Sequence, residues 1–404
     1  MDKRNLNIMH LATLLILSWL ALAANAQAAA AGDDIERIFS VEPAGTLYID
    51  SDSGAIEVST WDRDEVRVRV RNTNNFEIEV EQEGNDITVY ADSQRGFFRR
   101  GNNSIRFSAD VPRNFNVNLD TGGGAISVAS ISGDVVADTS GGPIDIGDVD
   151  GGDVEADTSG GAITIGNVNG SVAADTSGGR IRIGDVSGDV EADTSGGSIN
   201  IGNVGGDILA DTSGGSIEVG TSGGEMELDT SGGTIRAGFA DGPVLADTSG
   251  GNIYLDGSAV RVEADTSGGN VEIQRSGGAV YAGSSGGNIV IRQAVGPIIA
   301  DTAGGRIDAE LAGYTDDRDA TVELETAGGD VVVRIPANHQ ASVLADLEVT
   351  RRGRGDYRIV SDFDLDIGED NNGNIHARGD INGGGDIIYL ETTNSDISIL
   401  ATGN

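Results

Sequence analysis

The 404-residue sequence contains no cysteine, which excludes disulfide bonds and any thiol or cysteine-based metal site. Basic residues are scarce: 26 Lys and Arg stand against 65 Asp and Glu, and the formal net charge is −39. Because such a chain repels phosphate groups, we expect no nucleic-acid partner. Aromatic residues make up only 4% of the chain. With so few bulky side chains, we expect a thin and regular core.

Long hydrophobic runs are also rare, and the conspicuous one lies at the N-terminus. Lys3 and Arg4 precede the apolar residues 11–23, and a small-x-small tripeptide follows at 24–26. This order predicts a secretory signal peptide over residues 1–26 that is removed on export. The apolar stretch is about 13 residues long, short of the roughly 20 that cross a bilayer as a helix. We therefore expect no transmembrane segment after signal cleavage.

Glycine is in excess, with 62 residues, and much of it belongs to a repeated motif. The string DTSGG, or a close variant, recurs every 18 residues, apart from one spacing of 19. Counting the Asp as position one, position seven is always Ile or Val. Repetition this regular is typical of stacked repeat proteins. The copies begin at Asp120, Asp138, Asp157, Asp175, Asp193, Asp211, Asp229, Asp247, Asp265, Gly283 and Asp301, and a looser copy begins at Glu325.

Each repeat holds two short segments in which hydrophobic and polar residues alternate. Ile181 and Ile183 form one such pair, and Val190 and Ala192 form the other. This alternation predicts strands with one buried face, and the glycine-rich stretches between them predict turns. A unit this short buries its apolar face only by stacking on its neighbours. The predicted fold is therefore all-β: a parallel β-helix, or β-solenoid, with about 18 residues per coil.

The number of sides per coil is left open by the repeat length. The heptapeptide at 213–219 is echoed nine residues later at 222–228, which favours two sides, but a three-sided coil also fits. Strand-like alternation without the repeat flanks this region. We expect an N-terminal β cap over residues 27–118, the solenoid over 119–310 and a C-terminal β cap over 311–404. Such caps would cover sheet edges that otherwise invite aggregation.

Several motifs in this order resemble the bacterial putative adhesin family with a β-solenoid fold, a family of the domain-of-unknown-function type. The resemblance spans about residues 38–400. It implies a solenoid, an exported location and an adhesive role, and it brings no catalytic residues. The motifs are Trp61-Asp62-Arg63-Asp64-Glu65-Val66, Val111-Pro112, the Ser-Gly-Gly-x-Ile coils, Ile335-Pro336, and Ile381-Asn382-Gly383-Gly384-Gly385 followed by Ile387 to Leu390.

No catalytic constellation emerges from the residues. After signal cleavage the chain holds two histidines, His339 and His376, and no lysine. Arg180 and Arg182 could serve a polysaccharide-active β-helix enzyme, but an active site needs an unlike coil and these coils are nearly identical. We expect a non-catalytic exported protein of the periplasm or cell surface, an adhesin or scaffold without cofactor or metal. Its expected partners are envelope glycans or proteins, and a polysaccharide-active enzyme is the alternative.

The aspartates at position one form the first candidate contact surface. Stacked between coils, their carboxylates would repel one another unless hydrogen bonds or cations compensate. They would form either a row of weak Ca²⁺ sites, as in a cation-binding solenoid, or Asx turns that accept N–H groups of the following Ser and Gly. The sequence favours the Asx turns. The threonine at position two should then point inward, and the aspartate should face solvent.

A basic, aromatic loop is the second candidate contact surface. It is formed by Arg95, Phe97, Phe98, Arg99 and Arg100, in a region that is otherwise acidic. Aromatic and guanidinium groups together suit anionic glycans or lipid headgroups. The alternative is that the two phenylalanines plug the N-terminal cap while the arginines are solvated.

Overall fold

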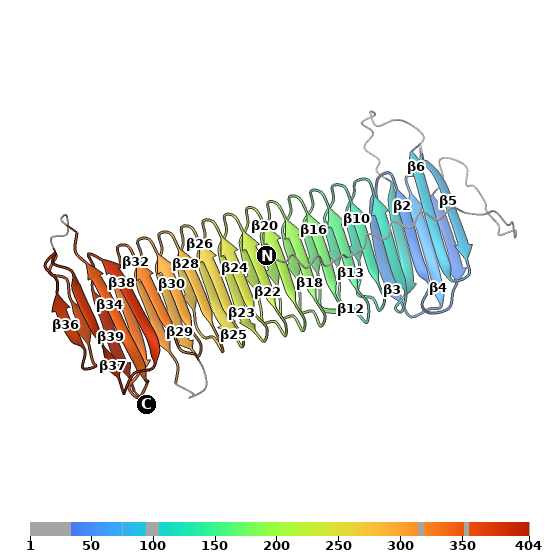
Figure 1. Ribbon diagram of the computed structural model, residues 1–404. Helices are drawn as coiled ribbons and strands as arrows, with labels where there is room; N and C mark the ends of the chain where they lie inside the picture. The colour runs from blue at the N-terminus through green and yellow to red at the C-terminus, as the bar shows by residue number, and fades with distance from the viewer. Residues whose placement is uncertain (1–33, 75, 94–104, 314–318, 351–354, 404) are drawn as a thin grey trace, which may run out of the picture.

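The computed structural model describes residues 34–74, 76–93, 105–313, 319–350 and 355–403. In this part of the chain every regular element is a β-strand, and nearly all strands belong to two long sheets that run along a rod (Figure 1). We name them sheet A and sheet B. The predicted all-β solenoid is confirmed.

Sheet A consists of β1 (Ile35–Ser40), β3 (Ala55–Trp61), β4 (Glu65–Arg71), β7 (Arg106–Pro112), β9 (Ile126–Val128), β11 (Ile144–Ile146), β14 (Ile163–Ile165), β17 (Ile181–Ile183), β19 (Ile199–Ile201), β21 (Ile217–Val219), β23 (Ile235–Ala240), β25 (Ile253–Ser258), β27 (Val271–Ile273), β29 (Ile289–Ala294), β31 (Ile307–Leu311), β33 (Val331–Pro336), β35 (Ile359–Ser361) and β39 (Ile397–Thr402).

Sheet B consists of β2 (Thr46–Ser51), β5 (Phe76–Glu83), β6 (Asp86–Ser93), β8 (Asn116–Thr121), β10 (Val135–Thr139), β13 (Val154–Thr158), β16 (Val172–Thr176), β18 (Val190–Thr194), β20 (Ile208–Thr212), β22 (Met226–Thr230), β24 (Val244–Thr248), β26 (Val262–Thr266), β28 (Val280–Ser284), β30 (Ile298–Thr302), β32 (Val322–Thr326), β34 (Ala341–Glu348), β36 (Asp366–Glu369), β37 (Ile375–Ile381) and β38 (Asp386–Thr393). Two short strands, β12 (Val149–Asp150) and β15 (Val168–Asn169), pair with each other.

Each repeat contributes one strand to each sheet, and neighbouring coils pair in parallel and in register. In sheet A, Ile181 pairs with Ile199; in sheet B, Val190 pairs with Ile208. A third ladder of single-residue parallel bridges runs along one edge of the coil, for example from Val186 to Val204. The coil is therefore built on two main sheets, with a narrow third ladder between them.

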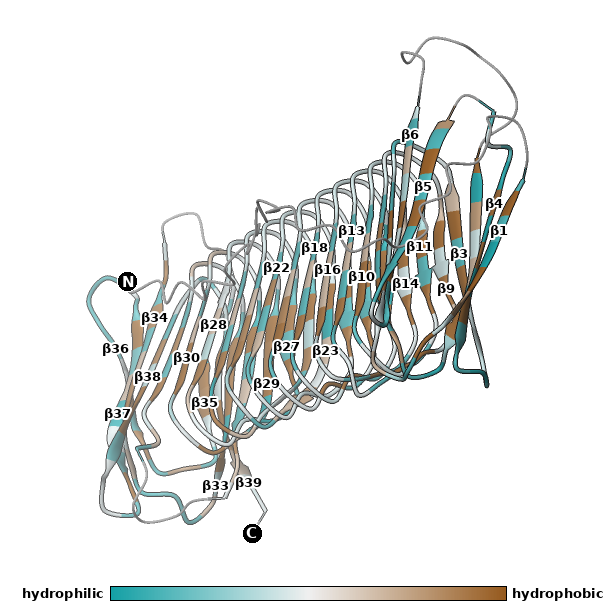
Figure 2. Cartoon of the chain, turned by 90° about the vertical axis from the view of Figure 1, so that its right-hand side faces the viewer, coloured by the Kyte–Doolittle hydropathy of each residue, from teal (hydrophilic) through white to brown (hydrophobic). Residues whose placement is uncertain are grey.

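Alternation along each strand places the apolar residues between the sheets. Ile181 and Ile183 are 1% and 2% exposed, and Val190 and Ala192 are equally buried. Figure 2 shows this pattern as hydrophobic and hydrophilic bands that alternate along the strands. Thr194 at position two is fully buried, as expected, and the Asp before it is exposed.

The order of the coils departs from chain order at both ends of the rod. The last coil, β38 and β39, lies between the coil of β32 and β33 and that of β34 and β35. At the other end, β2 and β3 lie between β6 and β7 on one side and β8 and β9 on the other. Both ends finish in antiparallel strands, which interrupt the parallel stacking direction. The flanking segments thus extend the same two sheets.

Candidate functional site

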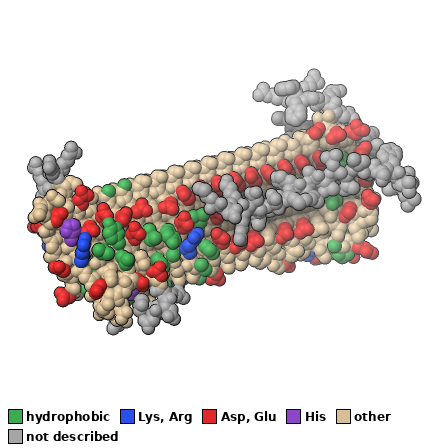
Figure 3. Space-filling view, in the orientation of Figure 1, with side chains coloured by type: hydrophobic (Ala, Val, Ile, Leu, Met, Phe, Trp, Pro, Cys, Tyr) green, Lys and Arg blue, Asp and Glu red, His purple; other side chains and the backbone are tan. Residues whose placement is uncertain are grey.

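The outer face of sheet B carries a continuous row of carboxylates, here called the acidic ladder. Parallel pairing places each position-one Asp directly beside the next, and Gly283 interrupts the row before Asp301. Rows of acidic side chains follow the long axis of the rod in Figure 3. Strands about 4.8 Å apart hold these groups close together. The ladder consists of Asp50, Asp120, Asp138, Asp157, Asp175, Asp193, Asp211, Asp229, Asp247 and Asp265.

Stacking raises the pKa of most ladder carboxyl groups above their ordinary value of 3.8. For Asp157, partial burial is the largest cause, and the charges of Asp138 and Asp175 in the adjacent coils add to it. The pKa of Asp193 is raised for the same reasons, between Asp175 and Asp211. The ladder is therefore a face where negative charges repel. Raised pKa values are found at Asp50, Asp120, Asp138, Asp157, Asp193, Asp211, Asp247 and Asp265.

The Asx-turn prediction for these aspartates is wrong, because the buried threonine closes the turn. The hydroxyl of Thr194 donates to the carbonyl of Gly179 in the preceding coil at 2.8 Å. The same oxygen accepts the amide N–H of Gly197 at 3.2 Å. A hydroxyl can both donate and accept, whereas a carboxylate only accepts, so threonine alone satisfies both backbone groups.

Aspartates do accept backbone N–H groups, but at other positions and between coils. Asp189 accepts from the N–H of Asp207 at 2.9 Å, and Asp207 accepts from Glu225 at 2.7 Å. A second row does the same on another turn, where Asp185 accepts from Asn203 at 2.7 Å. These bonds tie each turn to the next coil.

The outer face of sheet A carries a different set of charges from sheet B. Its arginines are mixed with acidic side chains such as Glu218 and Glu272, whereas Arg378 is the one arginine in a described strand of sheet B. Arg180 and Arg182 are both exposed on this side of the coil. The strand arginines of sheet A are Arg37, Arg67, Arg69, Arg71, Arg106, Arg182, Arg236, Arg292 and Arg334.

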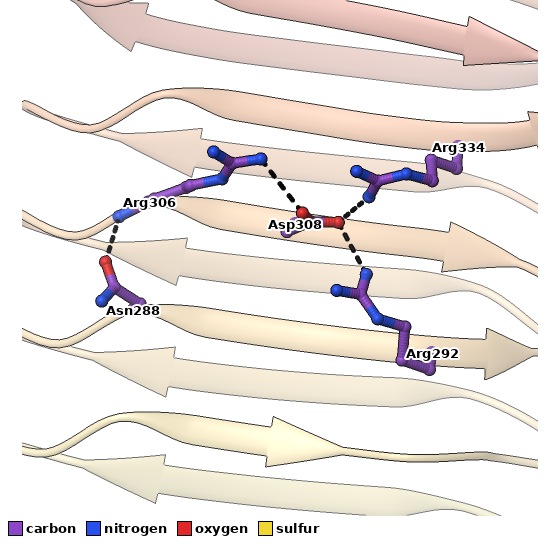
Figure 4. A network of polar contacts seen from close by, with 5 residues as sticks. All are labelled: Asn288, Arg292, Arg306, Asp308 and Arg334. Carbon is purple, nitrogen blue, oxygen red and sulfur yellow. Dashed lines mark hydrogen bonds and ion pairs between the residues drawn. The ribbon is translucent and has the colours of Figure 1, made fainter.

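Three arginines of this face converge on one carboxylate (Figure 4); we call them the arginine cluster. Asp308 on β31 is 7% exposed and lies between β29 and β33. Arg292 and Arg306 donate to its two oxygens at 2.7 and 3.1 Å, and Arg334 donates to Oδ1. Burial by itself would raise the pKa of Asp308, but the bonds from Arg292 and Arg334 hold it below 3.8.

A hollow of about 750 Å³, here called the corner hollow, borders the arginine cluster. Glu310 lines it and is paired in register with Arg334, and Gln293, which follows Arg292, lines it too. The repeat pattern breaks at this point: the strand register shifts between Ile291 and Ala294, and Gln293 has a φ of 46°.

The remaining lining of the corner hollow combines aromatic, charged and amide groups. The guanidinium of Arg275 lies 4.2 Å from the centroid of the Phe239 ring. Asn338 and Thr402 contribute polar side chains from the C-terminal coils. Such a mixed wall suits a polar ligand that presents both a flat ring face and hydroxyl groups.

The predicted contact loop of Arg95, Phe97, Phe98, Arg99 and Arg100 lies outside the described residues, as does the predicted signal peptide. The arginine cluster was not predicted from the sequence. The one feature of the sequence that pointed to the arginine cluster was the higher frequency of arginine toward the C-terminal end of the repeat region.

His376 lies in the C-terminal antiparallel strands. Its Nδ1 is 2.6 Å from Asp346 and its Nε2 is 3.8 Å from Asp370. Within the described ranges, no group of three His, Asp or Glu side chains is placed to hold a metal ion. The same part of the chain has no helix of the length and apolarity that crossing a membrane requires.

Comparison with known families gives a match to the model described as Toastrack DUF4097. The match covers residues 45–241, slightly less than half of the chain. This part of the chain is similar to the Toastrack DUF4097 domain. The Toastrack match begins in β2 and ends just after β23, so the arginine cluster lies beyond it. No curated protein matches the sequence.

Three solved structures align with much of the chain. A putative cell adhesion protein from Clostridium sporogenes is 9% identical, over 92% of this chain and 100% of its own, with a TM-score of 0.17. A putative adhesin from Bacteroides fragilis is 12% identical, over 75% and 97%, with a TM-score of 0.20. A putative lipid binding protein from Parabacteroides distasonis is 17% identical, over 73% and 97%, with a TM-score of 0.18.

Proposed function

We propose that the protein is a non-catalytic, exported rod that acts as an adhesin or scaffold in the periplasm or on the cell surface. The observation that carries this proposal is the unbroken parallel register of the central coils. This register repeats the outward-facing side chains of equivalent positions at the constant spacing between adjacent coils. Weak contacts repeated along a rigid rod add up by avidity, which suits a surface or polymer better than a single small substrate.

The alternative, a polysaccharide-active enzyme, would place its site in the corner hollow. That hollow is lined by one carboxylate, Glu310, and one guanidinium, Arg275. Glycoside hydrolysis generally uses a pair of carboxyl groups on either side of the scissile bond. The hollow therefore fits binding better than hydrolysis.

Two coils can be removed to test the rod without disturbing its register. Deleting residues 193–228 joins Ala192 to Asp229 and so recreates the repeat. We expect cell fractionation and protease accessibility on intact cells to place the full chain outside the cytosol. We further expect the purified shortened rod to bind envelope material more weakly than the full rod, but not to lose binding altogether.

A matched point variant separates avidity from a discrete site. Changing Arg180 and Arg182 to Ser alters one coil of the same rod and should leave retention on envelope material unchanged. Loss of retention in this variant alone, or a cytosolic location of the full chain, would overturn the proposal.

A further inference from the structure

We propose that the arginine cluster and the corner hollow together bind an anionic glycan. Its carboxylate, sulfate or phosphate group would lie against Arg292 and Arg334, and a sugar ring would occupy the hollow. The inference rests on the proposed surface function for the class of ligand. It concerns a single site near one end of the rod, beyond the residues that match the Toastrack family.

The arginine cluster has more donors than its one carboxylate can use. A guanidinium carries five N–H groups, and each of the three arginines directs one nitrogen at Asp308. Their side chains are 28–47% exposed, so the other donors are open to solvent. Even with Glu310, which is paired in register with Arg334, three positive charges face two negative ones. One positive charge is left for a second anion to balance.

The geometry suits an oxyanion with several oxygens. Arg292 and Arg334 lie on β29 and β33, which flank β31, so they reach Asp308 from opposite sides. A guanidinium matches carboxylate, sulfate and phosphate oxygens through paired N–H bonds. An oxyanion above Asp308 can therefore contact both arginines at once.

The corner hollow supplies the part of the site that recognises a sugar. It begins where the cluster ends, since Glu310 and Gln293 line it and adjoin Arg334 and Arg292. Amide and hydroxyl groups of Asn338 and Thr402 can pair with sugar hydroxyls. A volume of about 750 Å³ lies in the usual range of small-ligand sites.

Charge on the surrounding face favours a narrow glycan chain over a membrane. Three carboxylates and one guanidinium line a groove on nearby coils of sheet A: Glu218, Asp256, Glu272 and Arg236. A flat anionic bilayer would meet these groups as well as the arginines, whereas a sugar chain crosses only the site. The acidic ladder lies on the opposite sheet, and sheets pack about 10 Å apart, beyond the ~8 Å Debye length of physiological salt.

The test is calorimetric titration of the full chain with four probes in 150 mM salt. Oligogalacturonate carries carboxylates and a heparin oligosaccharide carries sulfates, so the two identify the preferred oxyanion. A neutral dextran oligosaccharide and vesicles with anionic headgroups are the comparison probes. We expect at least one anionic glycan to bind, and neither comparison probe to bind.

Arg292→Gln with Arg334→Gln should weaken that binding at least tenfold. Arg180→Gln with Arg182→Gln removes the same charge from the same sheet and should change it less than twofold. Because loss of arginines next to buried Asp308 could also impair folding, Asp308→Asn provides an opposite test. It frees the donors that the carboxylate occupies, so affinity should rise at least threefold.

The proposal is overturned if no anionic glycan binds, if both arginine pairs weaken binding equally, or if Asp308→Asn weakens it in a protein with native circular dichroism. Binding to vesicles in place of glycans would overturn it in favour of a membrane partner. Failure here with normal retention on envelope material would leave the surface function standing. A cytosolic location with normal glycan binding would overturn the proposed surface function and leave the glycan site standing.

Discussion

The hydroxyl of Thr176 donates a hydrogen bond to the carbonyl oxygen of Gly161 at 2.9 Å and accepts the amide N–H of Gly179 at 3.3 Å. Gly161 belongs to the preceding coil and Gly179 to the following turn. One buried side chain therefore closes a turn and ties two coils together. The same pair of bonds recurs along the solenoid, which makes this threonine the main polar element of an otherwise apolar core.

Thr176→Val should destabilise the protein although it keeps the shape of the side chain. The change leaves the buried carbonyl of Gly161 without its donor, at a cost of about 1–3 kcal/mol. Thr164→Val is the matched control, because Thr164 is exposed on the outer face of sheet A. It should change the free energy of unfolding by less than about 0.5 kcal/mol. Equal losses in chemical denaturation would show that the hydroxyl is not what matters.

The two glycines of each Gly-Gly pair should differ sharply in their tolerance of alanine. A Cβ on Gly197 would lie 1.8 Å from the carbonyl oxygen of Gly179, which is backbone and cannot move aside. A Cβ on Gly196 would have no neighbour closer than 3.6 Å. We expect Gly196→Ala to fold with a near-normal melting temperature and Gly197→Ala to lose several kcal/mol or fail to stack, as overpacked sites do. Similar melting temperatures for both variants would contradict the close approach of the coils.

Chelation should leave the fold intact. The turns are closed by threonine hydroxyls and backbone groups, so no cation is needed to complete them. We expect EDTA to shift the melting temperature by less than a few degrees and to leave the β signal in circular dichroism unchanged. Adding Ca²⁺ at low ionic strength should give at most the increase that an equal ionic strength of NaCl gives by screening the ladder. A larger, Ca²⁺-specific increase would show that the ladder binds this ion.

The repeat made the solenoid predictable because every coil has the same alternation of hydrophobic and polar residues. Thr176 could be placed inside by counting alternate positions from Val172, and the structure agrees. Which polar group closes the turn could not be decided in this way. Asp175 and Thr176 both suit turns, and only the position of the preceding coil's carbonyl shows that a donor is required there.

The arginine cluster and the ends of the rod were beyond sequence reasoning for a different reason. Asp308 and Arg334 are 26 residues apart, and the interval between these two repeats departs from 18 residues. Without the register of β31 and β33, nothing in the sequence indicates that they meet. The last coil is inserted between two earlier ones in the same way, through strand pairings that no local pattern encodes.

The acidic ladder should make the protein more stable at mildly acidic pH than at neutral pH. Its carboxyl groups have pKa values raised in the folded state, as at Asp193, through burial and the charges of neighbouring aspartates. Folding therefore favours their protonated forms. Their stabilising contribution is fully present below the unfolded pKa, near 3.9, and is lost as the pH rises through the raised folded pKa values. The melting temperature should accordingly rise as the pH falls from 7.5 towards 4.5.

The rise should end at lower pH, because Asp308 has the opposite shift. Its pKa is held below 3.8 by Arg292 and Arg334 despite burial, so its contribution is lost as the pH falls through that lowered value. Protonation there leaves the guanidinium groups facing one another without their carboxylate. Together the two effects predict a maximum of stability on the acidic side of neutrality, above the lowered pKa of Asp308.

Neutralising part of the ladder separates its repulsion from the general effect of net charge. Replacing Asp157, Asp193 and Asp211 with Asn should raise the melting temperature at pH 7.5 and flatten its dependence on pH between 7.5 and 4.5, because these groups no longer repel or bind protons. The measurement is thermal unfolding followed by circular dichroism across that pH range, at low salt and again in 0.5 M NaCl. Salt should reduce the difference between variant and parent, since it screens exposed charges.

The control removes the same charge from exposed aspartates that do not belong to the ladder, by replacing Asp145, Asp241 and Asp256 with Asn. These residues belong to other outward positions of the coil, so their replacement makes the net charge less negative by the same amount without opening a gap in the ladder. If the control raised the melting temperature and flattened the pH profile as much as the ladder variant, the net charge of −39 would be responsible. A larger rise in melting temperature in the ladder variant alone would show that the destabilising repulsion arises where parallel register brings the carboxylates side by side.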